Sequence, residues 1–180
     1  MKKILAFLII FGFASSSCEP DDICDPTTPT TPRMLIEFYD RKIPSKKKNV
    51  NDLKVIADGM GDEGVILNPD ATGDQRYLSN ANSILLPLNT VADLVNYRFI
   101  NYYGNKNLLL VNTDNITFRY SREDFYVSRA CGFKTVFTLA EKDPFTLTDA
   151  TPADDLWIGY IIVEQKNITY ENETIIKIFF

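Results

Sequence analysis

The feature that most constrains the fold is an alternation of apolar and polar side chains with a period of two, which begins after Arg33 and recurs to the C-terminus. It is clearest over residues 34–39 and 116–121. A period of two is typical of β-strands that bury one face. Only Val91 to Val95 hints at a helix, and no segment holds the helical period for three turns. The sequence therefore predicts an all-β domain over residues 33–180.

Turn residues divide this region into about nine or ten short strands, a pattern typical of an antiparallel β-sandwich, immunoglobulin-like or related. Leu108 to Val111 is a continuous apolar run that predicts a central strand, and Arg76 to Leu78 predicts a short one. Trp157 is expected in the core. The competing architecture is an eight-stranded outer-membrane barrel, suggested by the terminal Phe180. Short strands and the unalternating run at 108–111 disfavour it.

Residues 1–17 have the pattern of a signal peptide: two lysines, an apolar run of about ten residues and small residues before Cys18. The apolar run is too short to span a bilayer. Small residues ahead of a cysteine resemble the lipobox of bacterial lipoproteins, which implies acyl chains on Cys18 and a membrane anchor. Ser15 departs from the aliphatic residue usual there. The alternative is ordinary secretion, with cleavage after Ser16 or Ser17.

Residues 18–32 are expected to form an acidic, Pro/Thr-rich tether. Glu19, Asp21 and Asp22 resemble the export signal of Bacteroidota lipoproteins destined for the outer face of the outer membrane; the alternative is a plain solvated tether. The proline- and threonine-rich segment 25–32 predicts extended polyproline II structure.

With Cys18 lipidated, Cys24 and Cys131 predict one disulfide in an oxidising envelope. The alternative is two buried free thiols. The disulfide would close a loop of about 107 residues, which the chain-entropy relation values at nearly 5 kcal/mol. Cys24 follows Cys18 by six residues, at most about 20 Å of extended chain, so the domain would lie close to the membrane. The tether would then be strapped along the domain surface.

The chain contains no histidine, which excludes Ser-His-Asp and Cys-His catalysis and imidazole zinc sites. A net charge of −5 and a pI near 4.8 argue against nucleic-acid binding. No phosphate-loop or dinucleotide motif occurs, so no cofactor is expected. A hydrolase that uses carboxylates alone remains open, because any two acids could converge in space.

Tyrosines and asparagines near one predicted turn are the first ligand-binding candidates: Tyr97, Tyr102, Tyr103 and Asn105. Such side chains suit sugar stacking and adaptable recognition. The alternative is packing across a hairpin. Arg129 would point inward on a regular strand and need a carboxylate partner, unless a bulge near Gly132 turns it outward.

Acidic and basic loops supply weaker candidates. Asp70 and Asp74 are spaced like Ca²⁺ ligands, but Ser79 stands where such a loop needs a bidentate glutamate. The acidic glycine-rich segment 58–64 offers three more carboxylates. Both segments also fit ordinary solvated loops. Five basic residues between 41 and 48 could contact lipid headgroups or lipopolysaccharide phosphates, or simply keep a hairpin loop soluble.

Several stretches together resemble a family of small Bacteroidota lipoproteins classed as a domain of unknown function. They are the cysteine-acid stretch 18–24, the Ile-Glu-Phe-Tyr-Asp strand at 36–40, and the segments 83–89, 127–132 and 176–179. The resemblance implies a lipid-anchored envelope protein with a disulfide. It implies no activity and supplies no functional residues.

The leading hypothesis is a non-enzymatic binding or assembly module anchored in the outer membrane, on its cell-surface or periplasmic face. Its expected partners are the membrane, through the anchor, and an envelope protein or glycan. The alternative is a surface glycan-binding accessory protein, and the third hypothesis is a carboxylate-dependent hydrolase.

Overall fold

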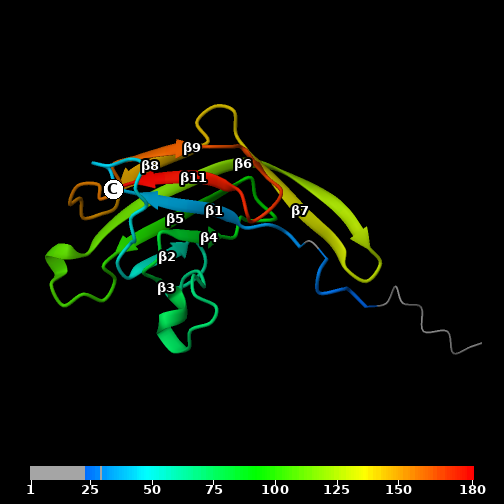
Figure 1. The fold of residues 1–180 in the computed structure, drawn as a ribbon, viewed down its shortest axis with the longest axis horizontal. Coiled ribbons are helices and arrows are strands. Elements are labelled where there is room, and N and C mark those ends of the chain that lie inside the picture. Colours follow the sequence, from blue (N-terminus) through cyan, green and yellow to red (C-terminus); the bar gives the residue numbers. More distant parts are fainter. Residues whose placement is uncertain (1–22, 29) are drawn as a thin grey trace, which may run out of the picture.

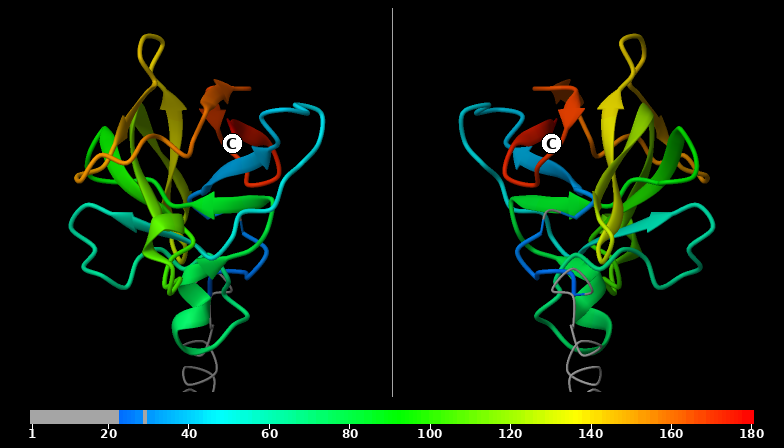
Figure 2. Two further views of the ribbon diagram at one scale, coloured as in Figure 1. Left: turned by 90° about the vertical axis from the view of Figure 1, so that its left-hand side faces the viewer. Right: turned by 90° about the vertical axis from the view of Figure 1, so that its right-hand side faces the viewer.

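Two β-sheets pack face to face in this computed structural model, which describes residues 23–28 and 30–180 (Figures 1 and 2). The predicted signal peptide, Cys18 and the acids after it lie outside the described residues. The predicted all-β sandwich is confirmed, with eleven strands instead of nine or ten. Within the described part of the chain, no helix is long and apolar enough to cross a membrane.

The first sheet pairs the beginning of the domain with its end. Its central strands β1 (Met34–Tyr39) and β11 (Thr174–Phe179) run parallel, so the sandwich is not wholly antiparallel as expected. The edge strands β4 (Ser83–Leu86) and β9 (Tyr160–Val163) are antiparallel to their neighbours, and the order is β4-β1-β11-β9.

The second sheet has seven strands, and all its pairings are antiparallel. Six follow the order β10-β7-β6-β5-β2-β3, and β8 also pairs with β6. Their bounds are β2 (Leu53–Ala57), β3 (Leu78–Ser79), β5 (Leu94–Asn101), β6 (Asn112–Ser128), β7 (Gly132–Leu139), β8 (Phe145–Asp149) and β10 (Asn167–Ile168).

Strand β6 merges two strands that the sequence predicted separately. Its first half pairs with β5 and β8, and its second half pairs with β7. Side chains alternate between buried and partly buried from Asp114 to Tyr120, but every residue from Ser121 to Tyr126 is exposed. The outer half of β6 therefore extends beyond the core.

The core lies between the sheets, where the period of two turns one side chain in every pair inward. Phe38 of β1 and Ile178 of β11 meet Phe99, Phe118 and other side chains of the second sheet. Each fully buried side chain of this size contributes about 1.5–3 kcal/mol through removal of apolar surface from water.

Three local predictions differ from the structure, two of them entirely and one in part. Leu108–Leu110 forms a 3₁₀ turn, η3, instead of a central strand: the side chain of Asn107 accepts a hydrogen bond from the Leu109 N–H, and the leucines are exposed. Segment 91–95 is no helix, since an Asx turn at Asn89 leads into β5. Of the short strand expected at Arg76 to Leu78, only Leu78 lies in a strand, β3, whereas Arg76 and Tyr77 belong to the 3₁₀ helix η2 (Gly73–Tyr77).

Trp157 is half-buried at the core edge and precedes β9; its indole N–H donates to the Phe99 carbonyl oxygen (3.1 Å). The start of the tether is also not extended as predicted. The N–H of Thr28 donates to the Asp25 carbonyl oxygen (2.9 Å), which closes a turn. Farther on, the Thr31 hydroxyl accepts the N–H of Thr135 (3.0 Å), so this part of the tether does lie along the domain.

Candidate functional site

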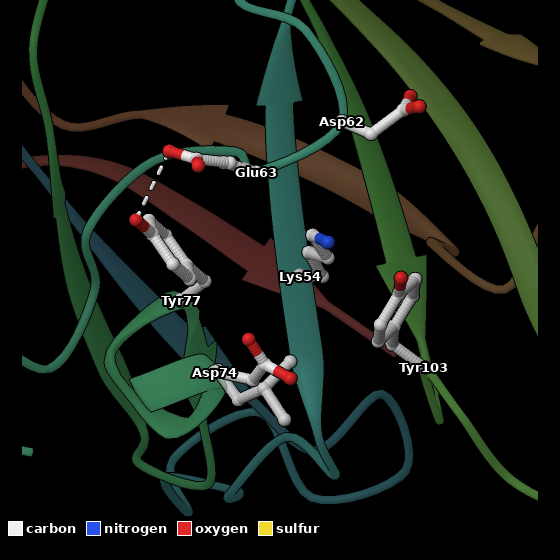
Figure 3. Close-up of a pocket in the computed structure, with 7 residues that line it drawn as sticks. Lys54, Asp62, Glu63, Asp74, Tyr77 and Tyr103 are labelled. Carbon is white, nitrogen blue, oxygen red and sulfur yellow. Dashed lines mark hydrogen bonds between the residues drawn. The ribbon is translucent and has the colours of Figure 1, made fainter. Parts of the chain in front are cut away.

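A pocket of about 280 Å³ opens where strand β2, the loop 58–64, helix η2 and the segment after β5 meet (Figure 3). It combines one cation, three carboxylates and two phenol rings. The lining residues are Lys54, Asp62, Glu63, Asp74, Tyr77, Leu78 and Tyr103.

Lys54 is the central side chain of this pocket. It lies on β2 and is only 7% exposed, and its Nζ is 4.2 Å from the centre of the Tyr103 ring. At this distance the ring attracts the ammonium group by a cation–π interaction. Across the described ranges, Lys54 makes no ion pair with a carboxylate. Figure 3 shows it between Tyr103 on one side and Glu63 with Tyr77 on the other.

The acidic side of the pocket depends on Gly64, which brings the loop 58–64 against β2. A Cβ atom at Gly64 would lie 2.7 Å from the Val55 carbonyl oxygen, and its φ of +85° is one that other residues rarely adopt. The N–H of Val65 donates to that same oxygen (2.8 Å). The loop is thereby held where Asp62 and Glu63 reach the pocket.

Glu63 also positions the ring of Tyr77, one of the two phenols in the pocket. Its Oε2 accepts a hydrogen bond from the Tyr77 hydroxyl (3.1 Å). Partial desolvation and the Glu63 carboxylate raise the pKa of Tyr77, so it stays a neutral donor. Asp74 enters from helix η2, one turn before Tyr77. Three carboxylates and one ammonium give the pocket a formal charge of −2, which favours ligands that donate hydrogen bonds and disfavours anions.

The comparisons with known proteins give one match. The model of the family of unknown function DUF6452 matches residues 52–180. The chain belongs to this family. No curated protein and no solved structure matches the chain. The matched range contains every residue that lines the pocket around Lys54, which we call the DUF6452 pocket from here on. It also contains Cys131, whereas Cys24 and the tether precede it.

The structure separates the tyrosines and asparagine that the sequence grouped. Tyr103 lines the pocket, as described. Tyr97 is 1% exposed and its hydroxyl donates to the Pro87 carbonyl oxygen, so its prediction as a ligand-binding residue is wrong: strand β5 turns it into the core. Tyr102 is half-buried at a φ of +55° and its hydroxyl accepts from Asn51 (3.1 Å). Asn105 accepts the N–H of Asn107 and closes the local turn.

Arg129 lies in the turn between β6 and β7 and is exposed. The inward orientation considered for it is wrong, because the strand pairing shifts register between Tyr126 and Ser128 and ends before it. The turn therefore carries Arg129 outward, as the alternative with a bulge anticipated. It does not line the DUF6452 pocket.

The weak calcium candidates are not assembled into a site. Asp74 lines the pocket, and Asp70 is exposed in the preceding loop. Among the residues that the structure describes, no group of three or more acidic or cysteine side chains is placed to hold a metal ion. The calcium-loop pattern requires consecutive ligands that converge on one point, and here the chain turns into η2 at Gly73.

The basic segment 41–48 is bound to its own domain. Lys47 forms an ion pair with Glu37, and the Nζ of Lys48 donates to the Phe180 carbonyl oxygen (2.9 Å). Lys48 also lies 4.0 Å from the centre of the Phe180 ring. These contacts hold Lys47 and Lys48 against their own domain, which favours the alternative of a charged hairpin loop over contact with lipid headgroups.

Sequence reasoning missed Lys54, Glu63 and Tyr77 as one constellation. The alternation over residues 53–57 predicts only that Lys54 lies on the polar face of a strand, and Glu63 stands out only as one acid of the segment 58–64. The signal that could have found Lys54 is a single cation inside the apolar run Leu53–Ala57, a strand whose five residues are all buried. A lysine there needs either a carboxylate or a ring for its ammonium group.

Apart from the pocket, two aspartates face each other across a strand pair of the second sheet. Asp114 of β6 is directly opposite Asp149 of β8, and Asp114 is 0% exposed. Burial raises its pKa to about 6, and the charge of Asp149 adds to the shift. A carboxyl with a raised pKa is typical of catalytic acids, but this one has no access to a substrate in the described structure.

Proposed function

We propose that the chain is a non-enzymatic binding module of the bacterial cell envelope, anchored in the outer membrane by lipid on Cys18, and that it is a lipoprotein of the Bacteroidota type. The observation that carries this proposal is the disulfide Cys24–Cys131, which has a sequence separation of 107 residues. It ties the folded domain to a point six residues after Cys18, at most about 20 Å of extended chain from the lipid.

The absence of histidine and the burial of Asp114 support a binding role over catalysis. Three accessible carboxylates, those of Asp62, Glu63 and Asp74, line a pocket beside a cation and two phenols. This composition suits recognition, because the rings can stack on a ligand while the carboxylates accept its hydrogen bonds.

Lipidation is tested by intact mass and membrane fractionation of the full chain, with Cys18→Ala as the matched control. We expect a diacylglycerol-type mass increase and membrane association for the parent, and neither for the variant. A parent chain of unmodified mass that fractionates with soluble proteins would refute the anchor.

The face of the membrane is tested by adding protease to intact cells. Loss of the domain would place it on the cell surface, where adhesion or glycan capture becomes the working hypothesis. Protection that ends when the outer membrane is opened would place it in the periplasm, where the search moves to envelope proteins.

A second candidate function is glycan binding, favoured by the DUF6452 pocket itself. Sugar hydroxyls are hydrogen-bond donors suited to Glu63 and Asp74, and a pyranose ring stacks on a phenol such as Tyr103. Because the pocket has a formal charge of −2, we expect neutral or amino sugars to bind better than uronic or sialic acids.

The test is a glycan-binding screen of the purified domain with Tyr103→Ala and the matched control Tyr170→Ala, another exposed tyrosine. We expect loss of binding only in the first variant. Tyr102→Ala is unsuitable, because it removes the hydroxyl that accepts from Asn51. Equal glycan binding by the parent and Tyr103→Ala would refute this pocket as a glycan site.

A further inference from the structure

The hairpin of β6 and β7 carries an arm, residues 121–135, that projects beyond the sandwich. Every residue from Ser121 to Tyr126 is exposed, which ends the alternation of buried side chains seen in the first half of β6. In Figure 1 the arm reaches away from the end at which the C-terminus lies, and the N-terminal segment runs to the same side. The arm does not contribute to the core as the rest of β6 does.

Aromatic side chains gather near the tip of this arm. Tyr126 is 63% exposed and Phe133 is 69% exposed; the two residues pair across the hairpin, with ring centroids 5.4 Å apart. Phe125 is also exposed, on the opposite face of the hairpin. Large apolar side chains clustered in water on a protruding hairpin are unfavourable for an isolated domain and indicate a surface that is covered in use.

The tip of the arm is also cross-linked to the N-terminal segment by the disulfide. Cys131, in the turn of the arm, forms the disulfide with Cys24, with their Cα atoms 4.9 Å apart. Ile23, the residue before Cys24, is largely exposed as well. Only five residues separate Cys24 from Cys18. An acyl chain on Cys18 therefore keeps the aromatic tip within about 20 Å of the bilayer, plus the width of the turn.

We infer that the tip of the arm, formed by Phe125, Tyr126 and Phe133, rests in the headgroup region of the membrane that holds Cys18. Aromatic rings, tyrosine above all, are favoured at this depth because their apolar body meets acyl chains while the hydroxyl stays hydrated. Lys134, beside these rings, lies where lipid phosphates would attract its ammonium group. The inference rests on the proposed lipidation of Cys18 and adds a second contact to it.

The second contact has a consequence for orientation. A domain held by a lipid chain alone can rotate freely about its flexible N-terminal segment. A lipid chain and a rigid aromatic tip together restrict the tilt of the domain relative to the membrane. The end of the sandwich that carries the C-terminus and the η3 turn lies opposite the arm in Figure 1 and would face away from the membrane. The arm would thus act as a short stalk made from the domain's own sheet.

The test adds one tryptophan as a reporter to the full chain, purified in detergent and reconstituted in phosphatidylethanolamine–phosphatidylglycerol liposomes that contain brominated lipid. The reporter variant is Phe133→Trp. The matched control is Leu109→Trp, at a side chain that is 94% exposed in the η3 turn, at the other end of the molecule. The parent chain, with Trp157 alone, gives the baseline quenching.

We expect brominated lipid to quench about half of the emission added by Phe133→Trp, with a blue shift, and to leave the emission added by Leu109→Trp unchanged. Equal quenching of the two reporters, or none at Phe133→Trp, in a chain whose mass shows the lipid would overturn the inference; an arm in water would then be free for a protein partner. A chain without the lipid adduct that fails to float with the liposomes would instead refute the anchor, before the reporter is read.

Discussion

The buried pair Asp114 and Asp149 makes a quantitative prediction about stability. Asp114 is fully buried, its Oδ2 accepts the Ile158 N–H (2.8 Å), and its Oδ1 has no hydrogen-bond partner among the described residues. Burial raises the pKa of Asp114 from 3.8 to about 6; the Ile158 hydrogen bond opposes the shift and the Asp149 charge adds to it. The folded protein therefore favours the protonated carboxyl.

The effect of Asp114 on the free energy of unfolding follows, in direction and in size, from the linkage between protonation and folding. Since the folded pKa lies above the unfolded one, the stability associated with the protonated carboxyl is present below about pH 3.8 and is lost as the pH rises through about 6. A shift of about two units corresponds to about 3 kcal/mol at neutral pH. Asp114→Asn keeps the shape and an acceptor for Ile158, but removes the charge.

We expect Asp114→Asn to raise the free energy of unfolding by up to about 3 kcal/mol at pH 7.5 and by less than about 1 kcal/mol at pH 4. The measurement is urea unfolding at both pH values with the disulfide intact. Asp70→Asn is the control, because Asp70 is exposed and its charge should change stability by no more than about 0.5 kcal/mol. A gain of equal size at both pH values, or a loss at pH 7.5, would refute the reasoning.

Three further predictions concern the edges of the domain. Cys131→Ser should lower the free energy of unfolding by up to about 5 kcal/mol, because the unfolded chain is no longer closed into a loop of 107 residues. The measurement is urea unfolding against the oxidised parent, and no measurable change would mean that the disulfide does not constrain the unfolded chain. Glu171→Gln removes the paired contact with Arg33, whose hydrogen bond lowers the pKa of Glu171. Its penalty, under about 1 kcal/mol for this half-exposed pair, should be present at pH 7 and decline as the pH falls below 4.5 and through the lowered pKa. Phe180→Ala removes the ring that meets Trp157 edge-on at 5.4 Å and should shift the indole emission to the red and cost about 2 kcal/mol; unchanged emission would contradict that packing.

Much of the fold follows from local sequence signals. The alternation over 34–39 and 116–121 predicts strands with one buried face, and both segments are strands of the sandwich. The pairing of Cys24 with Cys131 could also be predicted, because two cysteines remain once Cys18 is set aside. These features depend on the period of a strand and on the count of thiols, which a linear chain displays directly.

Other local structure could not be predicted because competing contacts decide it. Leu108–Leu110 is as apolar as a central strand, yet the Asn107 side chain caps a turn there and the leucines stay in water. Tyr97 and Tyr103 have the same side chain and lie six residues apart, but only the second reaches the pocket. The difference arises where the strand ends: β5 turns Tyr97 into the core and stops at Asn101, and the positive φ of Tyr102 (+55°) redirects the chain before Tyr103.

The sequence alone determined that this chain forms a β-sandwich with no histidine chemistry and a cysteine pair, because strand periodicity and composition are properties of neighbouring residues. Only the tertiary structure decided what the polar side chains do. Lys54, Glu63 and Tyr103 come from three separate segments, and Asp114 meets Asp149 across a strand pair. Such meetings depend on register and loop closure between residues far apart in the chain, and the arm tip joins Cys131 to Cys24 for the same reason.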